Sequence, residues 1–195
     1  GAKGGNCRWF KRAYAPGFPA VGDYGCWLEV QPWAVLCGAA PEGRAAELLA
    51  NLDELLRKDS PLGARLRWPV SDKMSPGEFG MGTGGGIWAS INMTLIWAAA
   101  RHAPELGWDE WNAMSLANHE ATYPDVWEGT LSGPDCYNAP ESSRPGRQWA
   151  LPGTTVCIQA FPVTNGHAHA PPILSYPRPP APDPTTPAAR PVRKG

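Results

Sequence analysis

Ile87-Trp-Ala-Ser-Ile-Asn-Met-Thr-Leu-Ile-Trp-Ala-Ala-Ala100 is the stretch of this 195-residue chain that decides its fold. It is apolar on nearly every side, and a helix with that pattern must be surrounded by other elements. The glycine-rich run Gly80–Gly86 precedes it directly. We therefore expect an interior helix over residues 87–100, opening from a long loop that covers residues 59–86.

Two further helices are predicted earlier in the chain, one buried and one amphipathic. Pro32 is tolerated in a first helical turn and Gly38 favours a helix end, so residues 31–38 are predicted to form a buried helix. The segment 41–58 carries leucines at helical spacing, which indicates an amphipathic helix with one buried face. The leucines are Leu48, Leu49, Leu52, Leu55 and Leu56.

Residues 108–121 are predicted to form a second amphipathic helix, with Asp109 and Glu110 in its first turn, where negative charge is favourable. Two pairs of helices, each with one buried and one amphipathic member, are typical of an α/α toroid. In such a toroid an inner ring of apolar helices is wrapped by an outer ring. We therefore predict an all-α fold, part of an α/α toroid with long loops, in which 59–86 and 122–166 are neighbours at one mouth.

The composition excludes several classes of partner. With a net charge of −1 and a pI near 6.5, bulk charge recruits neither nucleic acid nor a membrane surface. No apolar run reaches the ~18 residues of a membrane span. The five cysteines are scattered without a C-x-x-C pair, which indicates reduced thiols in a cytoplasmic protein. The chain starts with Gly1, and we interpret it as part of a longer protein.

Residues 123–138 combine aromatic side chains with acids and an amide, on backbone that Pro124 and Pro134 make irregular. A sugar ring stacks its C–H face on Trp or Tyr, while carboxylates and amides bind its hydroxyls. The ten tryptophans of the chain fit the same chemistry, although Trp also fills helical cores. The segment is therefore either a sugar-binding loop or a loop whose aromatics cap the core.

Polar groups precede both buried helices. Glu29 and Gln31 lie where the first begins, and they must find partners in the protein or in a ligand. Arg12 either belongs to a solvated basic face or binds anions and hydroxyls with its fork of donors. The amides of the glycine run are candidates for an anion. His167 and His169 have no third ligand nearby, so we expect no metal.

In their order along the chain, these segments resemble the inverting β-glucoside phosphorylases, the family that includes cellobiose phosphorylase and 1,2-β-oligoglucan phosphorylase. The resemblance covers about residues 8–170, and the motifs around Trp127 and Asp135 are most similar to the oligoglucan group. It rests on Arg12-Ala-Tyr14, Leu28-Glu-Val-Gln-Pro-Trp-Ala-Val-Leu36, Gly85-Gly-Ile-Trp88, Tyr123-Pro-Asp-Val-Trp127, Ser132-Gly-Pro-Asp-Cys-Tyr-Asn138 and Asn165-Gly-His-Ala-His169.

The resemblance implies the C-terminal part of an (α/α)6-barrel domain that acts on a β-glucan or oligosaccharide. In that family an Asp protonates the glycosidic oxygen while inorganic phosphate attacks the anomeric carbon with inversion, without a cofactor. We expect substrate contacts from Arg12, Glu29, Gln31, Trp33, Trp88, Tyr123, Asp125, Trp127, Asp135, Tyr137, Asn138 and His167. We expect phosphate contacts from Thr83, Gly84, Gly85, Gly86 and Ser90.

Two departures from the family pattern limit what can be carried over. The family's general acid lies in a Trp-Asp-Trp-Asn-Asp-like segment that this chain lacks, and Trp108-Asp-Glu-Trp111 falls in an outer helix. We therefore expect the acid upstream and the isolated chain to be inactive. Ser90 stands where cellobiose phosphorylase has a phosphate-binding His, and Gly82-Thr83 where it has a Lys-Glu pair. The alternatives are a hydrolase of the same toroid class and a non-catalytic glycan-binding remnant.

The end of the chain differs in composition from the rest. Residues 171–195 are rich in proline and poor in bulky apolar side chains, so we predict a disordered tail. The abrupt change at Pro171 suggests a shifted reading frame, with the domain confined to residues 1–170. The sequence leaves open whether the parent protein forms a homodimer.

Overall fold

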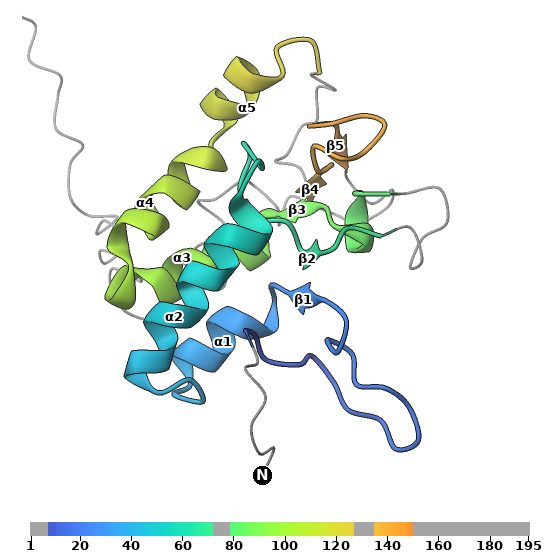
Figure 1. Cartoon of the computed structure of the whole chain (residues 1–195). Coiled ribbons are helices and arrows are strands. Elements are labelled where there is room, and N and C mark those ends of the chain that lie inside the picture. Colours follow the sequence, from blue (N-terminus) through green and yellow to red (C-terminus); the bar gives the residue numbers. More distant parts are fainter. Residues whose placement is uncertain (1–7, 72–78, 127–134, 150–195) are drawn as a thin grey trace, which may run out of the picture.

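The computed structural model describes residues 8–71, 79–126 and 135–149. These residues form a mostly helical fold with two small antiparallel sheets beside the helices (Figure 1). The helical character is thus confirmed, but the strictly all-α prediction is wrong, because segments of the loops pair with one another as short antiparallel strands. A closed ring of helices is not seen in the described part of the chain.

The first buried helix, α1, covers Val30–Leu36 and has Pro32 within its first turn, as predicted. Gly38 follows the helix with φ +76°, a conformation that glycine adopts without strain. The N–H of Gly38 donates to the carbonyl of Val35 at 3.1 Å, which closes the end of the helix. The predicted buried helix and its stop are therefore confirmed.

The amphipathic helix α2 covers Glu42–Leu52 and continues as a π-helical segment, η1, over Asp53–Arg57. It packs its leucine face against α3 (Ala89–His102), the second buried helix. Residues of α3 in this core are Leu95 and Ala99. All five leucines of the predicted face are buried: Leu48, Leu49, Leu52, Leu55 and Leu56.

The helix predicted over residues 108–121 is wrong in its bounds, because two helices occupy this region. Helix α4 covers Pro104–Ala113, starting earlier because Pro104 takes its first turn. Helix α5 covers Leu116–Thr122. Between them Ser115 adopts an extended conformation, and its side chain accepts from the N–H of Asn118 at 3.1 Å. A serine that can cap a new helix offers the backbone an alternative to continuing the old one.

The two sheets are built from strands of two residues each. In the first, β1 (Cys26–Trp27) pairs with β2 (Arg67–Trp68), and Trp27 lies opposite Arg67. In the second, β3 (Ile87–Trp88) pairs with β4 (Cys136–Tyr137), which also pairs with β5 (Gln148–Trp149). Residues 59–71, predicted as loop, therefore contain a strand, and their side chains Leu62, Ala64 and Leu66 are buried.

Both buried helices start at this layer of strands. Helix α1 begins three residues after β1 ends, and α3 begins directly after β3. The N–H of Leu66 donates to the carbonyl of Gly86 at 2.9 Å and links the two sheets. In Figure 1 the labelled strands lie together on one side of the helices. The N-terminal ends of α1 and α3 thus face one shared surface.

The expected proximity of the glycine run and the segment around Asp135 is confirmed. The pairing of β3 with β4 brings them together, and the N–H of Ala139 donates to the carbonyl of Gly80 at 2.7 Å. Trp127, His167 and the predicted tail 171–195 lie outside the described residues. No helix in the described part is long and apolar enough to cross a membrane.

Candidate functional site

At the start of α1, a hairpin arm places Arg12 against the helix. The N–H of Arg12 donates to the carbonyl of Val21 at 2.7 Å, which fixes the arm. The Arg12 guanidinium forms an ion pair with Glu29 and lies 4.5 Å from the centre of the Trp27 ring. A guanidinium over an indole face is an attractive cation–π arrangement. Two of the predicted substrate residues, Arg12 and Glu29, are therefore in direct contact.

A second guanidinium covers the same indole. Arg67 lies opposite Trp27 in the β1–β2 pair, and its Cζ is 4.6 Å from the ring centre. Burial lowers the pKa of the Arg67 side chain. Arg67 was not predicted from the sequence, because two-residue strands leave no alternating pattern that would indicate this pairing.

Gln31 serves the fold rather than a ligand. Its side chain is fully buried. It donates to the carbonyls of Trp27 at 2.7 Å and Phe10 at 2.9 Å, and accepts from the N–H of Phe10 at 2.8 Å. These bonds attach the N-terminal arm to α1. The structure therefore offers no surface of Gln31 to a sugar.

The glycine run uses its amides within itself. The N–H of Gly84 donates to the carbonyl of Met81 at 2.7 Å, and those of Gly85 and Gly86 both donate to Gly82. A Cβ on Gly85 would lie 2.6 Å from Val70 Cγ1, so close packing explains this glycine. The three amides predicted to bind phosphate are thus already engaged.

The remaining residues of the predicted phosphate site lie beside this run. Thr83 is exposed, and Ser90 is half-buried in the first turn of α3. Trp88 is half-buried, and its indole N–H donates to the carbonyl of Gly82 at 3.0 Å. Hydroxyl groups and the positive end of the α3 dipole are therefore what this surface offers to an anion.

The residues of the Asp135 motif are mostly inside the protein. Tyr137 and Asn138 are buried, and Asn138 Nδ2 donates to the carbonyl of Arg144 at 3.0 Å. Asp135 is 4% exposed, and burial raises the pKa of its carboxyl group. Continuing the β3–β4 register by one residue places Asp135 beside Ala89, the first residue of α3. Of the three, Asp135 is the one positioned at the helix ends.

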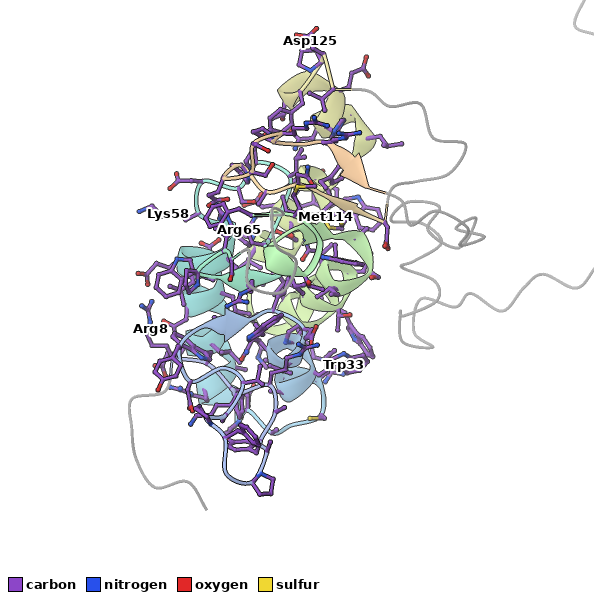
Figure 2. The ribbon with its side chains drawn as sticks, turned by 90° about the vertical axis from the view of Figure 1, so that its right-hand side faces the viewer. Arg8, Trp33, Lys58, Arg65, Met114 and Asp125 are labelled. Carbon is purple, nitrogen blue, oxygen red and sulfur yellow. The ribbon has the colours of Figure 1, made fainter. Side chains whose placement is uncertain are left out.

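Two predicted residues lie far from each other. Figure 2 shows Asp125 at one tip of the molecule, well separated from Trp33. Trp33 is 49% exposed and meets Trp97 edge to face, with ring centres 5.9 Å apart. Tyr123 lines a cavity of about 260 Å³ with His119, Glu120 and Pro124. Trp33 and Asp125 therefore do not belong to one small pocket.

Two ion pairs, each with one buried member, were not predicted from the sequence. Glu110, expected in the first turn of a helix, has no exposed surface, contacts Arg57 and accepts from the N–H of Ala64 at 2.7 Å. Arg65 forms a two-pronged pair with Glu141, at 2.8 Å and 3.0 Å. Both pairs join segments distant in sequence, so helical periodicity carries no signal for them.

No protein-family profile matches the chain, and no curated protein shows a significant match to it. Among the described residues, no group of three or more His, Cys, Asp or Glu side chains could hold a metal ion. The site is thus defined by its own geometry: Arg12, Glu29, Trp88, Asp135 and the first turn of α3.

Proposed function

We propose that this chain carries part of the substrate-binding face of an (α/α)6 glycoside phosphorylase. Such an enzyme cleaves β-linked glucosides or oligoglucans with inorganic phosphate and releases α-glucose 1-phosphate with inversion. The observation that carries the proposal is the convergence of both buried helices on one layer of strands. In an α/α toroid the cleft is formed by loops at one end of the inner helices. Here Glu29 precedes α1, while Trp88 and Asp135 lie at the start of α3.

The residues at this surface suit a sugar with several hydroxyl groups. Arg12 supplies donors, Glu29 supplies acceptors, and the half-buried Trp88 supplies an apolar face, whereas Asp135 is only 4% exposed. The general acid of the resembled family lies in a segment without a match in this chain. The proposal therefore assigns binding and positioning, rather than proton transfer, to the residues described above.

The first test is a titration of the full chain with gluco-oligosaccharides, followed by tryptophan fluorescence. We expect saturable binding of β-1,2- or β-1,4-linked oligosaccharides and none of an α-1,4-linked one. Glu29→Gln should weaken binding by about 10- to 100-fold, because a hydrogen bond to a charged group contributes ~1.5–3 kcal/mol. Glu47→Gln, on the outer helix α2, is the matched control and should leave the affinity unchanged. Equal binding of α- and β-linked sugars would reject the proposal.

One observation favours a hydrolase of the same class as a second candidate. The amides of Gly84, Gly85 and Gly86 are engaged within the loop, which removes donors that phosphate would need. The two candidates differ in whether phosphate and sugar bind together. If the chain belongs to a phosphorylase, inorganic phosphate should change the affinity for the oligosaccharide, because both ligands occupy one cleft. If it belongs to a hydrolase, the affinity for the oligosaccharide should be the same with and without phosphate at constant ionic strength.

A further inference from the structure

The groove between α3 and α4 is an apolar surface that lies outside the site described above. Its volume is about 310 Å³. Trp108 is 65% exposed and Trp111 is 36% exposed, so two large rings remain at the surface of α4. A concentrated apolar patch of this kind indicates a place where another segment binds. The described residues that line the groove are Ile96, Ala100, Pro104, Gly107, Trp108 and Trp111.

The shape of the groove follows from how closely the two helices pack. A Cβ on Gly107 would lie 3.4 Å from the Cβ of Ala99, so α4 is in close contact with α3 at this point. Trp108 follows this glycine, and Trp111 lies about one turn further along the same face of α4. The two indoles therefore line the α4 side of the groove, and Ile96 lines the α3 side.

The chain itself contains a segment whose composition suits such a surface. Residues 171–180, here called the proline segment, read Pro-Pro-Ile-Leu-Ser-Tyr-Pro-Arg-Pro-Pro. Pro177 and Pro180 are three residues apart, and the three-residue period of a polyproline II helix places them on one edge, about 9 Å from each other. Proline-rich segments dock through such an edge on grooves lined by aromatic side chains, because the extended helix is formed at low entropic cost.

The charges of the proline segment and of α4 are complementary. The segment has one charged side chain, Arg178. The exposed charged residues of α4 are both acidic, Glu105 and Asp109, and Glu105 lies three residues before Trp108, on the same side of the helix. Arg101, exposed in the last turn of α3, would repel Arg178. The favourable orientation therefore places Arg178 on the α4 side of the groove.

The connection to the proline segment is long enough for this contact. Trp149 ends β5, and residues 150–170 separate it from the proline segment. A chain of about 20 residues spans at most roughly 70 Å. Ile96 and Ala100 lie in the second half of α3, roughly 10–17 Å along the helix axis from its first residue beside the strands. The proline segment can therefore reach the groove of its own chain.

We propose that the groove between α3 and α4 binds the proline segment of the same chain as a polyproline II helix. In this arrangement Pro177 and Pro180 pack against Trp108 and Trp111, and Arg178 lies beside Glu105. The contact orders one part of a tail whose composition alone predicts disorder. It depends on the residues of the segment, whatever the origin of its reading frame, and it does not rest on the proposed phosphorolysis.

Photo-cross-linking of the full chain tests where the proline segment lies. Tyr176→p-benzoylphenylalanine places a photoreactive side chain beside Pro177, and peptide mapping after irradiation locates the bond that it forms. We expect cross-links to residues 96–111 in a product with the mass of one chain, at a yield that is independent of protein concentration. Ala188→p-benzoylphenylalanine is the matched control, because it carries the same group beyond the proline segment. Its yield at the groove should be at least threefold lower.

Variants in the cross-linking chain test which side chains are responsible. Trp108→Ala should lower the yield at the groove at least threefold, and so should Pro177→Ala combined with Pro180→Ala. The two proline changes leave the sequence of the helical core intact, and circular dichroism melts establish that Trp108→Ala is folded. Tyr24→Ala removes another exposed ring, 84% exposed on the N-terminal arm, and should leave the yield unchanged.

An exchange of charges tests the orientation of the segment. Glu105→Arg and Arg178→Glu should each lower the yield about twofold, since exposed ion pairs are weak, and the two changes together should restore it. The absence of recovery would overturn the contact between these residues. The docking itself is overturned if positions 176 and 188 cross-link to the same sites with equal yield. It is also overturned if the product is a dimer, which would assign the groove to the proline segment of a second copy.

Discussion

Glu110 shows how much of the stability can depend on one side chain. Its carboxylate is completely buried, and the lost hydration raises its pKa although Arg57 favours the charged form. It contacts Arg57 from η1 and the N–H of Ala64. A buried carboxylate with such partners joins α4 to the segments before α3. Removing it leaves the N–H of Ala64 without an acceptor and leaves Arg57 with Asp53 as its remaining ion-pair partner among the described residues.

We therefore expect Glu110→Ala to lower the free energy of unfolding by ~3–5 kcal/mol, the usual cost of breaking a buried ion pair. Asp109→Ala changes the exposed neighbour on the same helix and should cost less than ~0.5 kcal/mol. Urea denaturation followed by circular dichroism measures both. Equal losses in the two variants would mean that Glu110 does not hold α4 in this way.

The thiol of Cys26 predicts how stability depends on alkaline pH. Burial raises its pKa from 9.0 to about 12, so the folded protein keeps the thiol neutral while the unfolded chain ionises. This contribution to stability is complete below pH 9 and is lost as the pH rises toward 12, by up to ~1.4 kcal/mol per pH unit. Cys26→Ala should reduce that slope in urea denaturation between pH 9 and 11.

Tyr137 acts in the same direction, because burial also raises its pKa, so some alkaline loss should remain in Cys26→Ala. Peptide mapping after iodoacetamide treatment at pH 8 provides an independent check. Cys37 is exposed and should be labelled, whereas Cys26 should react only after unfolding. Identical slopes in the two proteins, together with rapid labelling of Cys26, would contradict its burial.

At the scale of elements, two glycines illustrate opposite requirements. Gly63 has φ +113°, and a Cβ there would lie 2.6 Å from Oε1 of Glu110. Gly43 is in the first turn of α2 with open space around it. The turn at Gly63 lets Ala64 present its N–H to Glu110 and its carbonyl to Asn92, so α3 and α4 both depend on it.

Gly63→Ala should destabilise the protein by more than ~1 kcal/mol, since both the backbone strain and the clash with Glu110 oppose it. Gly43→Ala should instead raise the free energy of unfolding by ~0.4–1 kcal/mol, because alanine restricts the unfolded chain at a compatible position. Thermal melts of the two variants give the comparison. Stabilisation by Gly63→Ala would show that the turn is not as close to α4 as described.

The helices were predictable because their signal is local. The leucine spacing of α2, the apolar run of α3 and the stop at Gly38 are each contained in one segment. The break between α4 and α5 at Ser115 was not predictable, because a serine is also common on the surface of a continuous helix. Only the hydrogen bond from the N–H of Asn118 to the Ser115 side chain shows that Ser115 caps a new helix. The site was predicted in part: Arg12 and Glu29 meet, whereas Gln31 and Asn138 are buried supports. Arg67 was not predicted, because Trp27, the residue it contacts, lies in a strand distant in sequence.

At the scale of the whole molecule, Arg65 joins the β3–β4–β5 sheet, here called the C-terminal sheet, to the helices. Its partner Glu141 lies between β4 and β5. Arg65 is buried, pairs with Glu141, and donates to the carbonyls of Leu56 at 3.1 Å and Lys58 at 2.7 Å. Figure 2 shows Arg65 in the middle of the molecule, between the tip at Asp125 and the end that carries Trp33. One side chain therefore connects parts that the short strands hold only weakly.

Arg65→Met should loosen the C-terminal sheet before it affects the helical core. Hydrogen exchange should become faster at the N–H groups of Asn138 and Ala139, which donate to Arg147 and Gly80, while the interior of α2 keeps its protection. Arg144→Met, at an exposed position in the same region, is the control. A uniform loss of protection in both regions would show that the parts unfold as one unit.

Hydrogen exchange of the full chain with and without a β-1,2-linked oligoglucan tests the central proposal most directly, because it locates the ligand. The account predicts slower exchange in residues 12–29, 83–91 and 135–137, around the start of α1 and α3. The groove between α3 and α4, which is lined by Trp108 and Trp111, should be unchanged. Protection confined to that groove, or to the tip at Asp125, would contradict a sugar-binding surface at the helix ends.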